Sequence, residues 1–229
     1  MSIFAVADLH LSFSGEKPMD VFGAAWVNHA ERLKEHWLRD VREGDTVIIA
    51  GDNSWALKLQ EAELDLEWIA DLPGKKILIK GNHDLWWNSV SKLNQFHPSM
   101  YFLQNTFYDA GGVAICGSRG WLSPGDDEYT AHDEKIYKRE LMRLEASLKA
   151  AREAGFDDII AALHFPPTNK RKEESGFTGL MRAYGVKIAV YGHLHGDEVF
   201  ANGLKGFHYG TEYKLVSLDY LHCELLKLA

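Results

Sequence analysis

Six short apolar segments, separated by stretches with helical spacing, limit the folds open to this chain more than any other feature of its sequence. The segments are residues 3–7, 46–50, 76–80, 113–116, 159–163 and 187–191. Apolar runs of this length, bounded by polar residues and turns, are typical of buried strands. Strands that alternate with helices along one chain indicate an α/β domain, and we expect a mixed sheet.

Three further segments repeat apolar side chains every three or four positions, which is the spacing of a helix with one buried face. They are residues 26–37, 61–72 and 137–151. Pro73 and Gly155 follow two of them and supply stop signals. The tail, residues 207–229, alternates without a helical period and predicts a closing set of antiparallel strands. No repeat or linker divides the chain, so we expect a single domain over residues 1–229.

The composition argues against several functional classes. The formal net charge is −8, which disfavours a general nucleic-acid binder because such proteins carry a basic face. Cys116 and Cys223 lie far apart without a CxxC motif, and this indicates a reducing compartment rather than a disulfide framework. The apolar N-terminus lacks the basic start of a signal peptide, and no run is long enough to span a bilayer. We therefore expect a cytoplasmic protein with no membrane partner.

Polar side chains follow five of the six expected strands at the point where each one ends. They are Asp8 and His10, then Asp52 and Asn53, then Asn82, His83 and Asp84, then His164, and finally His193 and His195. In open α/β sheets, ligands bind outside the carboxyl ends of the strands. One such block alone is common in turns, so the inference depends on all five occurring together. The set predicts that carboxylate, imidazole and amide groups meet at one edge of the sheet, where the strands have their carboxyl ends.

These groups form a donor set suited to metal ions. Imidazole nitrogen with carboxylate and amide oxygen, and no thiolate, favours Mn, Fe or Zn. Asp8 and His10 are two positions apart, so in an extended segment they leave the backbone on one face, and the same holds for His193 and His195. The candidates are too many for one tetrahedral site, whereas two ions sharing the carboxylate of Asp52 would use them. Two metals about 3.5–4 Å apart promote phosphoryl transfer by clamping the attacking and leaving oxygens.

Five sequence blocks occur in the order of a known family: DLH at 8–10, GDN at 51–53, GNHD at 81–84, a lone His164 and GHLH at 192–195. With these blocks the chain resembles the calcineurin-like metallophosphoesterase superfamily, in its broad bacterial branch of phosphoesterases similar to serine/threonine phosphatases. The resemblance extends over roughly residues 4–218. It implies a four-layer αββα sandwich, in which two mixed β-sheets are flanked by helices, with a dinuclear metal centre.

The resemblance also implies a role for each residue of the blocks. One metal ion is expected on Asp8, His10 and His195, and the other on Asn82, His164 and His193, with Asp52 as the bridge. His83 is implied to lie beside the phosphate, where it stabilises charge or protonates the leaving oxygen. Local geometry supports this division, because adjacent residues in an extended segment diverge and do not serve one metal. Asp84 is expected to anchor the loop.

The sequence departs from the protein phosphatases of this superfamily at two positions. Those enzymes carry an Asp, which orients the catalytic His, three residues after the bridging Asp, and this chain has Trp55 there. It also has GNHD at 81–84 where they have GNHE. Protein phosphatase activity is therefore not expected, and the residue that orients His83 is left open.

Trp55, Trp86 and Arg119 are the candidates for substrate contact. The two tryptophans follow site loops and, with Trp87 and Trp121, would form an aromatic wall against a nucleobase or an apolar leaving group. Packing in the core is the alternative for each of these tryptophans. Arg119 follows the fourth strand and would bind a substrate oxygen through its guanidinium group.

The sequence as a whole predicts a metal-dependent phosphoric ester hydrolase with a small phosphorylated substrate. We expect two divalent or trivalent ions, Mn²⁺ first and Fe or Zn as alternatives, and attack on a phosphomonoester or phosphodiester by a metal-bound hydroxide. Three alternatives stay open. A nuclease is disfavoured by the acidic balance, and a lipid-precursor pyrophosphatase needs an apolar flap that the sequence does not reveal. A non-catalytic, metal-stabilised scaffold has no use for His83. The oligomeric state is left open.

Overall fold

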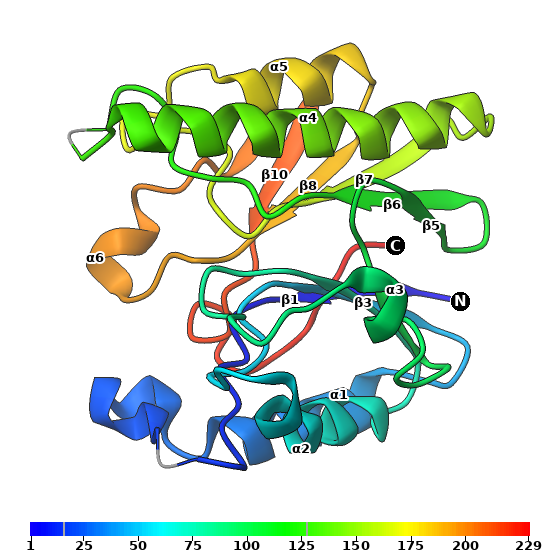
Figure 1. Cartoon of the computed structure of the whole chain (residues 1–229), viewed down its shortest axis with the longest axis vertical. Helices are drawn as coiled ribbons and strands as arrows, with labels where there is room; N and C mark the ends of the chain where they lie inside the picture. Colours follow the sequence, from blue (N-terminus) through cyan, green and yellow to red (C-terminus); the bar gives the residue numbers. More distant parts are fainter. Residues whose placement is uncertain (16, 127) are drawn as a thin grey trace.

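Two β-sheets packed face to face form the centre of the protein, and helices cover the outer face of each one (Figure 1). The computed structural model describes residues 1–15, 17–126 and 128–229. Sheets and helices together make four layers. This arrangement confirms the α/β fold with two mixed sheets that the sequence predicts.

The first sheet has the strand order β11-β1-β2-β3-β4. Its strands are β1 (Ile3–Val6), β2 (Thr46–Ala50), β3 (Lys75–Ile79), β4 (Met100–Phe102) and β11 (Leu226–Lys227). Strands β1 to β4 run parallel, and β11 pairs antiparallel with β1. The carboxyl ends of β1, β2 and β3 therefore lie along one edge of this sheet.

The second sheet has the order β5-β6-β7-β8-β10-β9. Its strands are β5 (Phe107–Asp109), β6 (Val113–Gly117), β7 (Asp158–Ala162), β8 (Ile188–Tyr191), β9 (Gly206–His208) and β10 (Thr211–Leu215). The four central strands are parallel, and β5 and β9 pair antiparallel at the two edges. A single bridge between Ala7 and Ser217 joins the two sheets just beyond β1.

Four longer helices form the outer layers. α1 (His29–Asp40) and α2 (Leu59–Ala70) lie on the first sheet, and α4 (Ala131–Glu153) and α5 (Gly176–Ala183) lie on the second (Figure 1). The shorter ones are η1 (Met19–Phe22), η2 (Ala24–Trp26), α3 (Val90–Leu93) and α6 (Asp197–Phe200). Within the described ranges, no helix combines the length and apolar character needed to cross a membrane.

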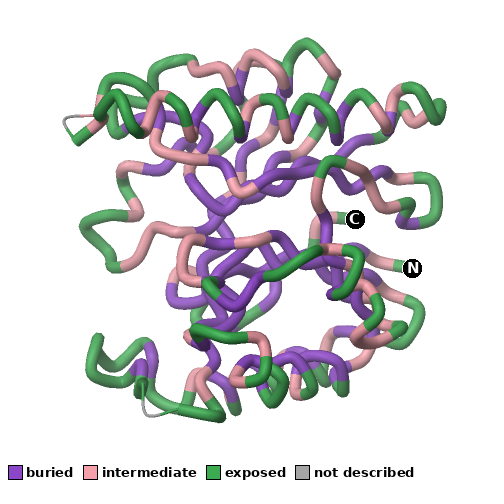
Figure 2. The backbone as a smooth tube through the Cα atoms, viewed as in Figure 1, coloured by how far each residue is buried: buried purple, intermediate pink, exposed green. Residues whose placement is uncertain are grey.

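Burial of the central strands on both faces explains their continuous apolar sequence. In β1, Ile3 and Ala5 pack between the sheets, whereas Phe4 and Val6 pack in the cluster that includes the helix residues of α1 and α2. Figure 2 shows the consequence, with buried backbone through the sheets and exposed backbone on the outer sides of the helices. Removal of this apolar surface from water, worth roughly 25 cal/mol per Å², is the main force holding the layers together.

The six expected strands occur within one residue of their predicted bounds, but the helices and the tail differ more. The helix expected at 26–37 begins at His29, because Trp26 belongs to η2 and Asn28 has a left-handed backbone with φ of 50°. In the tail, β9 and β11 are antiparallel as expected, yet β10 runs parallel to β8. An alternating pattern is the same for both directions, so the sequence could not distinguish them.

Lys76 is a buried charge in the middle of the first sheet. It lies on β3 with no exposed surface, and its Nζ donates to the carbonyl oxygens of Ala70 (3.0 Å) and Leu72 (2.5 Å). These carbonyls lie at the end of α2, where they lack partners within the helix, so the lysine caps that end. Burial lowers the pKa of Lys76 to about 8.

Replacing Lys76 tests this capping through its pH dependence. The folded pKa lies below the unfolded value of about 10.4, so between these values the unfolded chain binds more protons and stability rises with pH. We expect the free energy of unfolding of the wild type, relative to that of Lys76→Met, to increase by about 1–2 kcal/mol between pH 7 and pH 9.5. Urea titrations of both proteins at the two pH values measure this difference. Because the other titrating groups are the same in both proteins, their contributions cancel in the comparison. If the difference in unfolding free energy between the two proteins does not change with pH, Lys76 does not have the lowered pKa of a buried lysine.

Candidate metal centre

Loops at the carboxyl ends of strands from both sheets converge where the sheets join. The seven residues predicted as metal ligands lie in these loops: Asp8, His10, Asp52, Asn82, His164, His193 and His195. The N–H of Asp8 donates to Gly51 (2.9 Å) and that of His10 donates to Asp52 (3.0 Å), so the loops after β1 and β2 are bonded to each other. The backbone N–H of His193, from the second sheet, donates to the carboxylate of Asp8 at 3.0 Å.

The first group of donor atoms comprises Asp8, His10 and His195, whose ligand atoms all lie within 4.8 Å of one another. Nε2 of His195 is 3.5 Å from Nε2 of His10 and 3.8 Å from Oδ1 of Asp8. Asp8 and His10 are buried, and His195 is partly exposed. Two imidazole nitrogens that face each other beside a buried carboxylate are an arrangement that a cation would stabilise.

The second group comprises Asp8, Asp52 and His164, which meet the same distance criterion. Nε2 of His164 lies 3.3 Å from Oδ2 of Asp52 and 2.7 Å from Oδ1 of Asn82. Nδ1 of His193 lies 3.0 Å from the same oxygen of Asn82. Asp52 also reaches towards the first group, because its Oδ2 is 3.9 Å from Nε2 of His10. The structure therefore brings all seven predicted residues into one cluster, with Asp52 between its two halves.

Four of the seven residues have a backbone conformation that is rare outside glycine. The φ angles are 62° for Asp8, 46° for His10, 52° for Asp52 and 70° for His193. Each such residue costs of order 1–3 kcal/mol and persists only where the surrounding structure holds it in place. These sharp left-handed turns point the side chains back over the strand ends, so the strain lies at the site.

Two glycines allow the loops to approach each other closely. A Cβ atom on Gly81 would lie 2.0 Å from Oδ1 of Asp52, and one on Gly51 would lie 2.5 Å from Nδ1 of His164. Both glycines immediately precede a predicted ligand. The GDN and GNHD blocks therefore contain glycine because the next loop of the site occupies the space of a side chain.

Burial and charge separate the protonation states of the histidines. Burial lowers the pKa of His193 to about 3, and it lowers the pKa of His10 well below the ordinary value. Burial also disfavours the charged form of His164, but the carboxylates of Asp52 and Asp8 outweigh it and raise its pKa to about 9. Burial thus favours the neutral form of His10 and His193, whereas the neighbouring carboxylates favour a positive charge at His164. A metal cation bound among those carboxylates would take the place of that proton.

Asp219 is a residue of the site that the sequence analysis missed. Its Oδ1 accepts a hydrogen bond from Nδ1 of His195 at 3.0 Å, and its Oδ2 accepts one from the N–H of Gly196 at 3.1 Å. A carboxylate on the far nitrogen of an imidazole fixes the tautomer and directs Nε2 towards a metal. The backbone oxygen of Ala50 does the same for His164, at 3.1 Å from its Nδ1. Neither partner follows from a sequence block, because both come from segments distant in the chain.

Asp84 anchors the loops after β2 and β3, as expected. Its buried carboxylate accepts five hydrogen bonds, and the donors are the N–H groups of Asn53, Ser54 and Gly81, the Nδ2 of Asn53 and the Nε1 of Trp86. Burial, followed by the charge of Asp52, raises the pKa of Asp84 to about 6. The donors surrounding it oppose that shift and hold it as a carboxylate at neutral pH.

His83 and Trp55 lie side by side at the edge of the cluster. The N–H of His83 donates to Oδ1 of Asp52 at 2.8 Å, and the His83 ring packs edge-on against His10 at a centroid distance of 5.7 Å. Its ring centroid is 4.3 Å from that of Trp55, and the Trp55 ring also stacks on His10 at 4.8 Å. The tryptophan thus holds the imidazole of His83 by packing, at the position where related phosphatases use a carboxylate.

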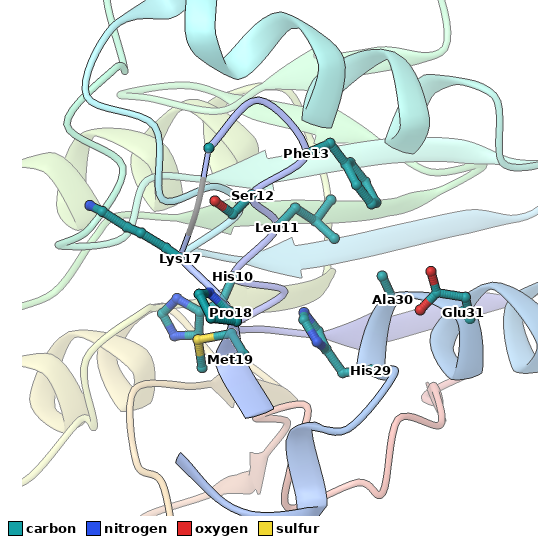
Figure 3. A pocket seen from close by; sticks show the side chains of 11 residues that line it. His10, Leu11, Ser12, Phe13, Lys17, Pro18, Met19, His29, Ala30 and Glu31 are labelled. Atoms are coloured by element: carbon teal, nitrogen blue, oxygen red, sulfur yellow. The ribbon is translucent and has the colours of Figure 1, made fainter. Parts of the chain in front are cut away.

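Two cavities adjoin the cluster at His10. One of about 320 Å³ is lined by His10, His83, His195, Met19, Phe22, Trp26 and Trp55. The other, of about 420 Å³, lies between residues 10–15 and 17–19 on one side and the start of α1 on the other, and Figure 3 shows His10, Met19 and His29 along it. The first cavity brings His83 and two predicted ligands to the surface beside an apolar wall.

The structure separates the three candidate substrate contacts. Trp55 lines the first cavity, in agreement with its position beside His83. Trp86 is only 2% exposed and packs against Trp87 and Phe102, so the expectation that it contacts substrate is wrong and core packing explains it. The Arg119 guanidinium lies 4.4 Å over the ring of Trp121 and 3.8 Å from Glu140, so it is held at the side of the cluster.

Comparisons with known proteins agree with this geometry. A family model described as calcineurin-like phosphoesterase matches residues 1–197. No curated protein matches the chain. Among solved structures, the phosphopantetheinyl hydrolase of Mycobacterium tuberculosis is 15% identical with a TM-score of 0.55, and the alignment covers 99% of this chain and 95% of that one.

Two other solved structures are similar over nearly their whole length. The protein TT1561 of Thermus thermophilus is 13% identical with a TM-score of 0.59, covering 99% of this chain and 97% of that one. The protein of unknown function AQ665 from Aquifex aeolicus is 14% identical with a TM-score of 0.54, covering 99% and 95%. At such low identity these similarities establish the fold alone.

Asp84→Asn tests whether this carboxylate holds the loops of the site. An amide would turn an NH₂ group towards N–H donors, so at least one of them would lose its acceptor inside the protein. We expect the free energy of unfolding in urea to fall by about 2–4 kcal/mol. Asp109→Asn is the control, because its exposed carboxylate accepts from the N–H of Gly112 alone among the described residues, and it should lose less than about 1 kcal/mol. Equal losses in the two variants would contradict the anchoring role.

Proposed function

Because this chain belongs to the calcineurin-like phosphoesterase family, we propose that it is a hydrolase that uses two metal ions to cleave a phosphomonoester or a phosphodiester. The observation that carries the proposal is the convergence of seven residues with nitrogen or oxygen donors, Asp52 among them, next to a cavity that contains His83. Membership of the family and the candidate ligand groups support a metal-dependent phosphoesterase.

The donor set fits two ions. We assign Asp8, His10 and His195 to one ion, Asn82, His164 and His193 to the other, and Asp52 to both. The set has imidazole, carboxylate and amide donors without thiolate, so Mn²⁺ is the first choice and Fe or Zn are alternatives. When bound, such a pair of ions polarises phosphate oxygens and lowers the pKa of water at the site. Left-handed backbone at four of these residues supports a site prepared for ions, because such strain is found most often at functional sites.

We assign His83 the task of donating an N–H to the leaving oxygen of the substrate. Its ring lies in the cavity wall and outside the ligand cluster, and its backbone N–H is tied to Asp52. Trp55 limits rotation of the ring through their contact at 4.3 Å. A fixed donor beside the reacting phosphate stabilises charge that develops only in the transition state.

The walls of this cavity favour a leaving group with apolar surface. Met19, Phe22, Trp26 and Trp55 line it, and they come mainly from the segment that contains η1 and η2. Aromatic rings of this kind stack on flat groups or pack against alkyl chains. A small phosphorylated metabolite with such a group is the substrate that we propose.

An exposed apolar segment keeps a second candidate function open. On η1, Val21 and Phe22 are 71% and 68% exposed, and both line a shallow cavity with Lys17 and Trp55. Such a segment beside the cavity would serve as the apolar flap that a lipid-precursor pyrophosphatase requires and that was not evident from the sequence. The net charge of −8 continues to disfavour a nuclease, and the cavity beside His83 disfavours a scaffold without activity. Buried free thiols at Cys116 and Cys223 agree with a reducing compartment such as the cytoplasm.

Removal and return of metal test the proposed activity directly. Protein stripped of metal should not hydrolyse p-nitrophenyl phosphate or bis-p-nitrophenyl phosphate, and added Mn²⁺ should restore hydrolysis of at least one of them. The ratio of the two rates distinguishes a monoesterase from a diesterase. If no divalent ion supports turnover of either ester while the protein still binds about two ions per chain, the chain is a metal-binding protein without this activity.

His83→Ala separates catalysis from metal binding. Since His83 lies outside the ligand set, the variant should keep its metal content, measured by elemental analysis, and lose kcat by about 100-fold or more. His164→Ala is the comparison, and it should lose metal and activity together because it removes a ligand that contacts both Asp52 and Asn82. Loss of metal in the His83 variant would show that His83 is a ligand and would overturn its assignment as a proton donor.

A further inference from the structure

Four positively charged side chains gather beside the metal centre around a single buried carboxylate. Glu140 of α4 has no exposed surface, and its Oε1 lies 2.9 Å from Arg143, 3.3 Å from Arg139 and 3.8 Å from Arg119. Lys80 is the fourth, because the charges of Arg119, Arg143 and Glu140 act on its ammonium group, which forms no ion pair among the described residues. Lys80, Arg119, Arg139 and Arg143 are called the cationic cluster below.

The three arginines of the cationic cluster share one carboxylate in direct contact, and Asp84 and Asp52 act on Lys80 and Arg119 from a greater distance. All three arginine contacts use the same oxygen of Glu140, and its other oxygen, Oε2, has no hydrogen-bond partner among the described residues. In a chain with a net charge of −8, like charges held together at this one place are unfavourable unless an anion binds among them.

The cluster is connected directly to the second half of the metal centre. Lys80 immediately precedes Gly81 and Asn82 at the end of β3. On the other sheet, the backbone oxygen of Arg119 accepts hydrogen bonds from the N–H groups of His164 and Phe165, both at 3.0 Å. An anion bound by the cluster therefore lies beside a phosphate held at Asn82 and His164.

The exposed fractions identify the side chains that can reach such an anion. Arg139 is 48% exposed and Arg143 is 31% exposed, whereas Arg119 is 16% exposed and packs over Trp121. Guanidinium groups recognise phosphate through two parallel N–H donors, and a free lysine adds a point charge. The members of the cationic cluster that can reach an anion are thus Arg139, Arg143 and Lys80. Arg119 is the most buried of the three arginines and contacts Glu140.

We propose that the cationic cluster is a binding site for a second phosphate group of the substrate. This inference rests on the proposed function, and it narrows the substrate class to phosphate esters that carry another phosphate a short distance from the one that is cleaved. The apolar cavity takes one part of such a molecule and the cationic cluster takes the second phosphate, on the other side of the metal centre.

The test measures affinity without turnover. Calorimetry on the metal-loaded protein compares α,ω-alkane bisphosphonates of three to eight carbons with the alkyl monophosphonates of the same length. We expect one chain length at which the bisphosphonate binds about tenfold or more tightly, because a charge-assisted contact is formed at each end. Raising the salt concentration should reduce this preference, since Arg139 and Arg143 are partly exposed. Equal affinities of the two series at every length would overturn the proposal.

Matched variants assign the preference to the cluster. Lys80→Gln and Arg139→Gln should each lose most of the preference for the bisphosphonate. Lys80→Gln should also unfold at the same or a higher temperature, because it removes the charge repulsion between Lys80 and the arginines. Lys149→Gln is the control, since this exposed lysine lies on the same helix beside Glu153 and has the same charge change. A preference that survives in the two cluster variants, or that is lost in the control, would also overturn the proposal. If the preference is present but neither a phosphomonoester nor a phosphodiester is hydrolysed with any metal, the proposed function fails and the anion site stands.

Discussion

At the junction between the two sheets, carboxylates and imidazoles are buried close together, and this costs free energy unless their charges are balanced. Asp8, Asp52 and His164 have almost no exposed surface, and their charges balance only within the cluster. Everything nearby serves to hold this arrangement. Left-handed turns direct the side chains inwards, Gly81 makes room for Asp52, and Asp84 ties the loops of β2 and β3 together. The surrounding apolar layers provide the stability that this concentration of polar groups removes.

Trp55 determines how the ring of His83 is held in place. A carboxylate beside an imidazole would fix one tautomer and raise the basicity of the ring, whereas an indole ring restricts its rotation and excludes water without adding charge. The same indole stacks on His10, so it couples the wall of the cavity to one half of the cluster. In this chain the orientation of His83 therefore depends on packing, and the segment carrying Met19 and Phe22 completes that packing from the other side.

The sequence was sufficient to identify the strands and the polar residues at their ends, since both follow from local patterns. Each block combines an apolar run, a turn and a group with unusual chemistry, and such signals do not depend on distant segments. Asp219 was missed because its only mark is its contact with His195, which the fold creates. Trp86 was assigned to the site wrongly for the same reason, since only the fold decides whether a tryptophan after a site loop faces the core or the cavity. The direction of β10 depends on its neighbour β8 and not on its own residues.

The two sides of the metal centre differ in chemistry, and this difference limits which substrates can use the site. Towards His10 the wall is apolar and aromatic, while beyond Asn82 it is cationic. An ester with one phosphate and a small polar alcohol would leave both walls unused, so its binding would depend on the metal ions alone. Binding energy from the remote parts of a larger substrate can instead position the phosphate against His83. Under the proposed function, the group of adjacent cations would let this acidic protein select among phosphorylated molecules, which the metal centre by itself does not distinguish.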